Sequence, residues 1–342
     1  QKRIVHTALN LARCRMQLIT DQTEIEKIFS SINQDDLPYW NDHPLFGELY
    51  RHSEPFTGLA DPAYRPCHIA IIEDQVPIAV IAATLRECKI NHYGFPARIA
   101  FRKNLSKRGF KEALGLIIKG LKIAAGPSGA KASILGGTWG APLSRIDREM
   151  VTRMASPFMR THAISELSAS PTQIKQNIRK SYRSLITWGK QNLRMRYVSA
   201  DSPNFALFKK LPNFHRQIAG KNYYGPVFWE TLWVSITQGA AELSLAYLEQ
   251  DQLVGCVYVA DAGETSYYSM GIFNRELFDK PLSHFPIFDA IFRARCRNMK
   301  IFDLGEIPVQ IDGVNEKEVK IGFFKRGFAS NFNRFTLWEL EL

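Results

Sequence analysis

The sequence predicts an α/β (α+β) protein built from two similar mixed-sheet units with flanking helices, and three observations support this prediction. The chain has 342 residues, about twice the length of an average domain. Its composition is that of a globular protein, with 45% hydrophobic and 23% charged residues. A hairpin, a helix and a short strand ending in glycine occur in this order twice, about 170 residues apart. We therefore expect an N-terminal domain over residues 1–155 and a C-terminal domain over residues 156–342.

The first occurrence of the repeat begins at His68–Ala83, where two apolar runs flank an acidic turn and predict an antiparallel hairpin. A helical pattern follows at Phe110–Ala125, and a short apolar strand follows it at Ser133–Gly137. A helix that leads into a buried apolar strand is half of a right-handed crossover. We therefore expect this strand to run parallel to a neighbour in a mixed sheet.

The second occurrence has the same three parts. Leu243–Ala260 predicts the hairpin, Phe285–Asn298 the helix and Lys300–Gly305 the strand. Because hairpin, helix and strand often follow one another, an accidental similarity is the alternative. If the repeat is real, two similar units meet along a cleft, with their boundary between Thr138 and Phe158.

A basic helix is predicted between the two repeats, over Pro171–Lys190. Seven basic residues and no acidic residue lie between positions 173 and 196. Lys175, Arg179 and Arg183 recur at helical spacing with Lys180 beside them, so that like charges repel unless an anion neutralises them. We predict that Arg179, Lys180 and Arg183 bind a phosphate; a solvated basic face is the alternative.

The charge balance also indicates an anionic partner. The chain has 44 Lys and Arg against 33 Asp and Glu, a formal net charge of +11. A nucleic acid, a phosphorylated small molecule and an anionic membrane surface all fit this excess.

Other residue patterns exclude several classes of protein. The cysteines are scattered and form no CxxC pair, which argues against a disulfide framework or a zinc knuckle. The eight histidines form no metal-binding pair, so we expect no metal and interpret them as surface or hydrogen-bonded structural residues. No apolar run approaches the roughly 18 residues of a spanning helix, and no signal-like segment is present. We expect a cytoplasmic protein, with a peripheral contact at the inner membrane face left open.

Short motifs in the second half resemble those of a known family. They are Ile178–Ile186, Asn222–Pro226, Ser266–Met270, Ile301–Gly305 and, most specifically, Lys320–Phe328, which contains Phe-Lys-Arg-Gly-Phe. In this order they resemble the FemAB group of the GNAT-like transferases, which append amino acids to peptidoglycan precursors from aminoacyl-tRNA. The resemblance runs from about Phe158 to the C-terminus and weakly through the N-terminal repeat. It implies two tandem GNAT-like domains, although the long helical hairpin of some members is missing.

Acyl transfer to an amine needs a carbonyl held close to the amine and stabilisation of the developing oxyanion. We predict that Lys325, within the most specific motif and between Phe323, Phe324 and Phe328, provides this charge stabilisation. Asp303, on a strand expected to be buried, is the second catalytic candidate, because a buried carboxylate is costly unless paired or functional. A surface lysine at 325 and a structural pair of Asp303 with Arg293 or Arg297 are the alternatives, and Glu306 is a substitute for Asp303.

Aromatic residues complete the predicted site. Tyr267 and Tyr268 alternate across a strand, so that one could face the substrate slot. Tyr223 and Tyr224 lie beside Gly225-Pro226, where their rings could bind a sugar or base. Phe324 is assigned to substrate binding with them, and core packing is the alternative for each tyrosine.

The resemblance implies a transferase that moves an aminoacyl or acyl group to an amino group of a nucleotide- or lipid-linked cell-envelope precursor. The reaction would be a direct attack in a ternary complex, without a metal or a permanently bound cofactor. The donor stays open between aminoacyl-tRNA, acyl-CoA and acyl carrier protein, and the acceptor is an anionic, phosphate-bearing molecule.

Two other functions remain open at this point. One is an N-acyltransferase that uses acyl-CoA or acyl carrier protein and acts on an amino sugar or amino acid. The Arg/Gln-x-x-Gly-x-Gly/Ala pattern of coenzyme A enzymes is absent from both repeats, which argues against coenzyme A. The other is a non-catalytic basic protein that binds nucleic acid or a membrane, although no RNA- or DNA-reading motif is present.

Overall fold

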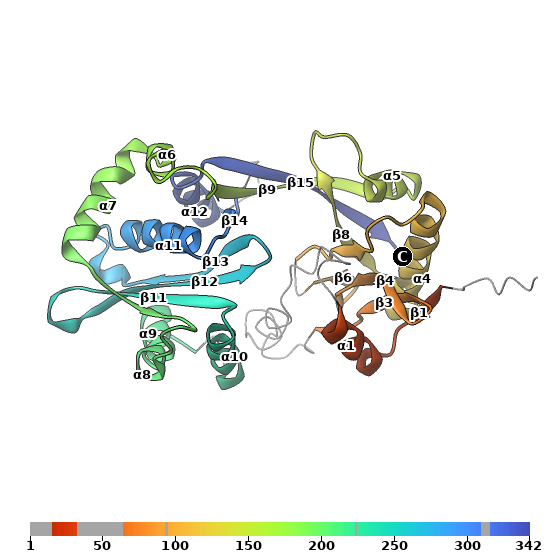
Figure 1. The fold of residues 1–342 in the computed structure, drawn as a ribbon, viewed down its shortest axis with the longest axis horizontal. Helices are drawn as coiled ribbons and strands as arrows, with labels where there is room; N and C mark the ends of the chain where they lie inside the picture. Colours follow the sequence, from red (N-terminus) through yellow and green to blue (C-terminus); the bar gives the residue numbers. More distant parts are fainter. Residues whose placement is uncertain (1–15, 33–63, 93–94, 223, 309–314) are drawn as a thin grey trace, which may run out of the picture.

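The computed structural model describes residues 16–32, 64–92, 95–222, 224–308 and 315–342. Two α/β halves lie side by side and are joined by two long strands (Figure 1). Along the described parts of the chain, no helix has the length and hydrophobicity needed to cross a bilayer.

The N-terminal half contains eight strands and three helices among its described residues. They are β1 (Gln17–Ile19), α1 (Gln22–Ser31), β2 (Arg65–Pro66), β3 (Ile69–Glu73), β4 (Val76–Ile81), β5 (Thr84–Arg86), β6 (Lys89–Asn91), β7 (Ile99–Phe101), α4 (Lys107–Ala125), β8 (Lys131–Thr138) and α5 (Arg145–Thr152).

The remaining elements follow in chain order. They are β9 (Ser156–Glu166), α6 (Pro171–Asn177), α7 (Lys180–Asn192), β10 (Arg194–Val198), α8 (Phe205–Phe208), α9 (Lys210–Ala219), α10 (Pro226–Thr237), β11 (Ala241–Tyr247), β12 (Leu253–Ala262), β13 (Thr265–Phe273), α11 (His284–Cys296), β14 (Ile301–Glu306), α12 (Glu316–Arg326) and β15 (Asn331–Glu341). Two short 3-10 turns, Glu249–Asp251 and Arg275–Leu277, lie between strands or before a helix.

The predicted order of hairpin, helix and strand is confirmed in both halves. β3 pairs with β4 and β11 with β12, each antiparallel. After its helix, each half has the expected parallel strand: β8 follows α4 and pairs with β6, and β14 follows α11 and pairs with β13. α4 begins three residues earlier than predicted, because Ser106 caps its first turn by accepting a hydrogen bond from the Gly109 amide.

In both halves two parallel strands start together and then separate. In the C-terminal half, β13 and β14 pair only over Thr265–Tyr267 and Ile301–Asp303. In the N-terminal half, Ala97 bridges Ile134, after which β7 turns away to pair with β4. As a result the N-terminal half has a separate sheet of order β1-β3-β4-β7, where a single mixed sheet was expected.

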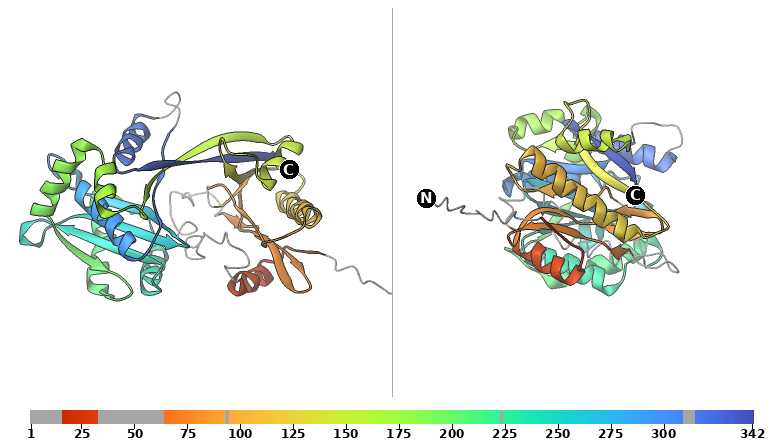
Figure 2. Two further views of the ribbon diagram at one scale, coloured as in Figure 1. Left: turned by 45° about the horizontal axis from the view of Figure 1, so that its top comes forward. Right: turned by 90° about the vertical axis from the view of Figure 1, so that its right-hand side faces the viewer.

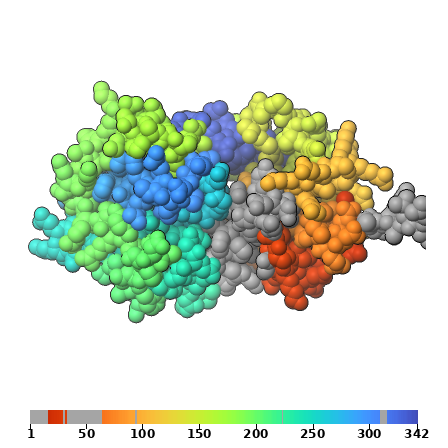
Figure 3. All heavy atoms as spheres, viewed as in Figure 1, coloured from red at the N-terminus to blue at the C-terminus, as the bar shows by residue number. Residues whose placement is uncertain are grey.

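The two halves exchange their last strands. β9, which follows β8 and α5, pairs with β14 of the C-terminal half, and β15, which follows β14 and α12, pairs with β8 of the N-terminal half. β9 and β15 also pair with each other along most of their length (Figure 2). This pairing makes one sheet of order β10-β11-β12-β13-β14-β9-β15-β8-β6-β5-β2 through both halves. In Figure 3 the blue C-terminal strand lies at the surface between the halves.

Because of this exchange, a sequence boundary does not separate the halves in space. Trp338 and Leu340, near the C-terminus, are buried in the N-terminal core beside Ile134 and Leu114. The domain boundary between residues 155 and 156 therefore stays a prediction, and it divides the sequence rather than the structure.

The central strands of the C-terminal half are buried on both faces. Every residue of β11 is buried, which explains why its sequence reads as a nearly continuous apolar run. One face, with Leu243 and Tyr258, packs against α8, α9 and α10, and the other, with Val257 and Val259, packs against α6, α7 and α11.

The prediction of one basic helix over Pro171–Lys190 is wrong. The chain leaves the helical conformation at Ile178 and Arg179, which separate α6 from α7. Ile178 is buried, and the amide of Arg179 donates a hydrogen bond of 2.9 Å to the carbonyl oxygen of Gly327. These contacts across the fold override local helix propensity, so the basic residues before and after the break do not share one helical face.

Candidate functional site

A large cavity lies where the two halves meet. It has a volume of about 1030 Å³, and residues of both halves and of the joining strands β9 and β15 line it. The two places where parallel strands separate both open into it, one at Ile99, Phe101 and Leu135, the other at Tyr268, Ser269 and Gly305. The separation of strands seen in the fold therefore creates this cavity from both sides.

Asp303 lies in this cavity and is held at both carboxylate oxygens. The residue is buried on β14, with 8% of its surface exposed. Its Oδ2 lies 2.8 Å from Nδ1 of His162 on β9, and its Oδ1 accepts a hydrogen bond of 2.7 Å from the amide of Gly305. Such bonds compensate the cost of burying a carboxylate and fix its orientation.

The last position of the Ile301–Gly305 motif requires glycine for two structural reasons. Its φ of +87° is a conformation that residues with a side chain rarely adopt, and a Cβ at this position would lie 3.0 Å from Nζ of Lys325. The glycine lets the backbone turn so that its amide reaches Asp303, and it leaves room for the ammonium group.

Lys325 comes to the cavity from α12. Its Nζ donates a hydrogen bond of 3.1 Å to the backbone carbonyl of Glu306. Burial lowers the pKa of this ammonium, and the nearby carboxylates of Asp303 and Glu306 oppose part of the shift. The structure therefore brings Lys325 and Asp303, the two predicted catalytic residues, into one cavity.

The surroundings predicted for Lys325 are wrong. Phe323 is 62% exposed and lies under the guanidinium of Arg179, at 3.9 Å from its ring centre. Phe324 and Phe328 pack against each other and against His284. Because successive residues of a helix point about 100° apart, Phe323 and Phe324 face other directions than Lys325. The ammonium of Lys325 instead lies at the backbone carbonyl of Glu306, near the carboxylates of Asp303 and Glu306.

The opposite face of the Phe-Lys-Arg-Gly-Phe motif holds α12 against α7. The ring of Tyr182 lies so close to Gly327 that a Cβ there would approach it to 2.1 Å. The same ring packs against Phe324 and Phe328. Phe324, predicted to bind substrate, thus lies in this aromatic cluster and does not line the cavity.

The basic residues after α6 also lie outside the cavity lining. Arg179 donates to the carbonyl of Phe323 at 3.0 Å and to the hydroxyl of Tyr182 at 3.1 Å. Arg183 is exposed and donates to the carbonyl of Gln176, and Lys180 is exposed. Arg179 is part of the contact between α7 and α12, whereas Lys180 and Arg183 remain accessible to an anion.

The predicted tyrosines have different positions. Tyr267 and Tyr268 both line the cavity, and burial raises the pKa of Tyr268, which also packs against the core. Tyr224 stacks on Phe228 with ring centres 3.9 Å apart, in an aromatic group on α9 and α10 that does not line the cavity. Tyr223 lies outside the described residues.

Sequence reasoning missed several residues of the cavity. Arg160 and His162 line it from β9, and Arg98 and Arg145 line it from the N-terminal half. Arg160 forms an ion pair with Glu306. The alternation of Arg160 and His162 ahead of the apolar residues Ala163 and Ile164 was a usable signal, since alternate residues of a strand share one face.

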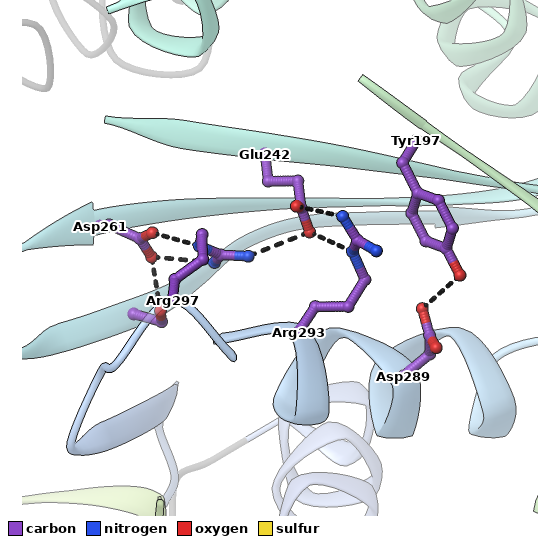
Figure 4. A network of polar contacts seen from close by, with 7 residues as sticks. Tyr197, Glu242, Asp261, Asp289, Arg293 and Arg297 are labelled. Atoms are coloured by element: carbon purple, nitrogen blue, oxygen red, sulfur yellow. Dashed lines mark hydrogen bonds and ion pairs between the residues drawn. The ribbon is translucent and has the colours of Figure 1, made fainter. Parts of the chain in front are cut away.

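The structure contradicts a pair between Asp303 and Arg293 or Arg297. Glu242, with 5% of its side chain exposed, forms ion pairs with both arginines, and Arg297 also pairs with Asp261 (Figure 4). Beside them, Tyr197 donates to Asp289 at 3.0 Å. Figure 4 shows that this network joins α11 to the sheet. Both arginines are therefore paired with other carboxylates, and Asp303 contacts His162 instead.

The charges of the cavity lining favour an anionic ligand. Four Lys or Arg residues and two acidic residues line it among the described parts of the chain. No group of three His, Cys, Asp or Glu side chains that could hold a metal occurs among those residues. Arg98 and Arg145 line the end of the cavity that the N-terminal half forms.

Solved structures share this fold. FemX superposes with a TM-score of 0.62 at 13% identity, covering 94% of this chain and 96% of its own. A tandem GNAT protein from the clavulanic acid biosynthesis pathway gives a TM-score of 0.52 at 11% identity, with 96% and 98% covered. These likenesses confirm the fold class predicted from the motifs, two tandem GNAT-like domains.

A third likeness is to the C-terminal domain of a putative lysylphosphatidylglycerol synthetase from Agrobacterium fabrum. Its TM-score is 0.54 at 10% identity, with 77% of this chain and 81% of that chain covered. No protein-family model and no curated protein sequence matches this chain.

Proposed function

We propose that the protein is a transferase that moves an aminoacyl or acyl group to an amino group of a nucleotide- or lipid-linked cell-envelope precursor. The observation that carries this proposal is the convergence of Lys325, Asp303 and Gly305 at the point where β13 and β14 separate into the cavity. The shared fold with FemX and with a domain of a putative lysylphosphatidylglycerol synthetase supports the choice of reaction.

In this proposal the donor carbonyl lies beside Lys325. The ammonium stabilises the negative charge that develops on the carbonyl oxygen as the amine attacks, and its partial burial strengthens this interaction. The new bond joins the amine nitrogen to the carbonyl carbon, and the bond from that carbon to the donor oxygen or sulfur breaks. The reaction needs no covalent intermediate, so both substrates occupy the cavity together.

The basic N-terminal end of the cavity supports an anionic substrate. The guanidinium of Arg145 lies 5.8 Å from the ring centre of Phe110, and its Nη1 donates to the carbonyl of Leu105. An arginine held in this way can bind a phosphate without losing much further conformational freedom. Arg145, with Arg98, is our candidate for binding the phosphate of donor or acceptor.

A second candidate is an N-acyltransferase that uses acyl-CoA or acyl carrier protein. It is favoured by the place where β7 and β8 separate, which also opens into the cavity. The helix that follows β7, α4, has the basic residues Lys107 and Arg108 in its first turn, and these suit an anionic donor. The tandem GNAT protein, whose name describes a form without AcCoA, has the same fold. The two candidates differ in the donor and share the chemistry at Lys325.

One experiment separates the candidates. Purified protein is incubated with charged total tRNA, with acetyl-CoA and with acylated carrier protein in separate reactions, each with an envelope extract. Mass spectrometry then identifies which donor is consumed and which product gains mass. Consumption of none of the three, with extract present, would contradict a transferase and favour a non-catalytic basic protein.

A further inference from the structure

The cavity contains a pair of side chains that the predicted site did not include, His162 and Asp303. His162 lies on β9, opposite Glu306 of β14 on one side and Asn333 of β15 on the other. Its side chain is 26% exposed and lines the cavity, and its ring meets Phe335 edge-on at 5.1 Å between centres. The ring is thus held by packing while one edge faces the cavity.

The contact with Asp303 determines which ring nitrogen of His162 carries a proton. Nδ1 lies 2.8 Å from Oδ2 of Asp303, and an ionised carboxylate only accepts hydrogen bonds, so Nδ1 is the donor. In a neutral imidazole Nε2 then has a lone pair. Within the described part of the chain, Nε2 has no hydrogen-bond partner.

Asp303 itself is poorly placed to take a proton from a substrate. One oxygen is occupied by the amide of Gly305 and the other by His162, and 8% of the residue is exposed. A carboxylate bound in this way orients the imidazole and stabilises the imidazolium ion, as the carboxylate beside a catalytic histidine does in other enzymes.

We infer that His162 is the general base of the transfer, with Asp303 as its positioning residue. This inference rests on the proposed function, and it gives Asp303 a positioning role where the sequence predicted a catalytic one. As the nitrogen–carbon bond forms, Nε2 takes one proton from the attacking amine. The donor oxygen or sulfur leaves as its bond to the carbonyl carbon breaks, and it takes that proton from the imidazolium.

Charged groups around the imidazole fit this role. Asp303 and Glu306 face it from β14, Arg160 from its own strand and Lys325 from α12, while Asn333 and Phe335 on β15 are neutral. Arg160 is paired with Glu306, whereas Asp303 contacts the ring of His162 and Lys325 donates to a backbone carbonyl. In this proposal Lys325 stabilises the oxyanion that forms as His162 takes the proton.

Kinetics test the inference in the full-length protein, with whichever of the three donors the wild type consumes. His162→Gln should lower kcat about 10² to 10⁴-fold with little change in the donor KM. In His162→Ala, added imidazole should raise the rate about tenfold, which a purely structural histidine would not allow. His215→Gln, at a histidine outside the cavity lining, is the control and should keep wild-type kcat.

Nitrogen NMR of the histidine rings tests the geometry without any substrate. In the neutral ring of His162 the proton should lie on Nδ1, and Asp303→Asn should disturb this tautomer. The opposite tautomer in the wild type, or wild-type kcat in His162→Gln, overturns the inference. If the wild type consumes no donor, the proposed function fails together with the role as a base, while the NMR result still decides whether the pair exists.

Discussion

Nε1 of Trp338 donates a hydrogen bond of 2.7 Å to Oδ1 of Asp147, across 191 positions of sequence. Trp338 lies on β15, the strand that the C-terminal half contributes to the N-terminal sheet, and Asp147 lies in the first turn of α5. The same carboxylate accepts from the amides of Gly137 and Ser144. Asp147 therefore joins β8, α5 and the exchanged strand at one buried point.

Replacing the indole donor should weaken this junction. We expect Trp338→Phe to lower the free energy of unfolding by about 1 to 3 kcal/mol, because it removes one bond to a buried carboxylate and leaves a small void. Urea denaturation measures the effect. Trp139→Phe, at a tryptophan that is 43% exposed, is the control and should change stability little. Equal effects of the two substitutions would show that the bond contributes nothing.

The same carboxylate should make the fold sensitive to acid. Burial raises the pKa of Asp147, but the hydrogen bonds from Ser144, Trp338 and Gly137 outweigh it and place the pKa below 3.8. A carboxylate with a depressed pKa stabilises the fold above its unfolded pKa, and this stability is lost as the pH falls through the folded pKa. We expect Asp147→Asn to be less stable than wild type at pH 7 and to lose less stability between pH 5 and about pH 2. Denaturation at several pH values measures this, and parallel curves would contradict it.

Much of the fold followed from local sequence patterns. The hairpins at β3–β4 and β11–β12 were predictable because acidic turns separate apolar runs, and a run such as β11 is buried on both faces. The break at Ile178 and Arg179 was not predictable, because it depends on contacts with Gly327 and Phe323, about 145 positions away. The exchange of β9 and β15 is equally non-local, since nothing in either strand specifies its partner.

The site was predictable only in part, for the same reason. Lys325 and Asp303 belong to short motifs whose glycines have an identifiable task, so they could be found in sequence. His162 belongs to no motif, and it becomes significant because β9 pairs with β14. Phe324 was placed in the site by its proximity in sequence to Lys325, although the helix turns the two side chains to different faces.

The basic residues around α7 should separate into a structural and an accessible group. Arg179→Ala should destabilise the protein by about 1 to 3 kcal/mol, because it removes bonds to Phe323 and Tyr182. Lys180→Ala combined with Arg183→Ala should leave stability nearly unchanged. If these two residues bind a phosphate, the double variant should raise the KM of the phosphate-bearing substrate more than tenfold at low salt. An unchanged KM would identify a solvated basic surface.

The buried ion pairs of α11 should be important for stability. Glu242→Gln leaves Arg293 and Arg297 without their shared carboxylate, and breaking a buried ion pair in this way costs about 3 kcal/mol or more. Chemical denaturation should detect this loss. Glu249→Gln, at an exposed glutamate beyond the end of β11, is the matched control. A stability loss below about 1 kcal/mol in Glu242→Gln would mean that water replaces the carboxylate.

The lowered pKa of Lys325 has a consequence for stability as well as for activity. Since burial disfavours the charged form in the folded protein, the unfolded chain binds the proton more tightly. Between the folded pKa and the ordinary value of 10.5, stability should therefore rise with pH in the wild type. Lys325→Met lacks this contribution, and at pH 7 it should unfold at the wild-type temperature or slightly above.

Although replacing Lys325 should not destabilise the fold, it should lower activity. If its positive charge stabilises the oxyanion, Lys325→Met should lower kcat about 10² to 10³-fold, while loss of a ground-state contact would mainly raise KM. Wild-type kcat should fall as the pH rises through the lowered pKa of Lys325, at a pH below 10.5. Lys325→Arg should restore activity only in part, because a guanidinium does not fit the space above Gly305, but its remaining activity should lack this alkaline decline. Wild-type turnover by Lys325→Met would remove the residue from the mechanism.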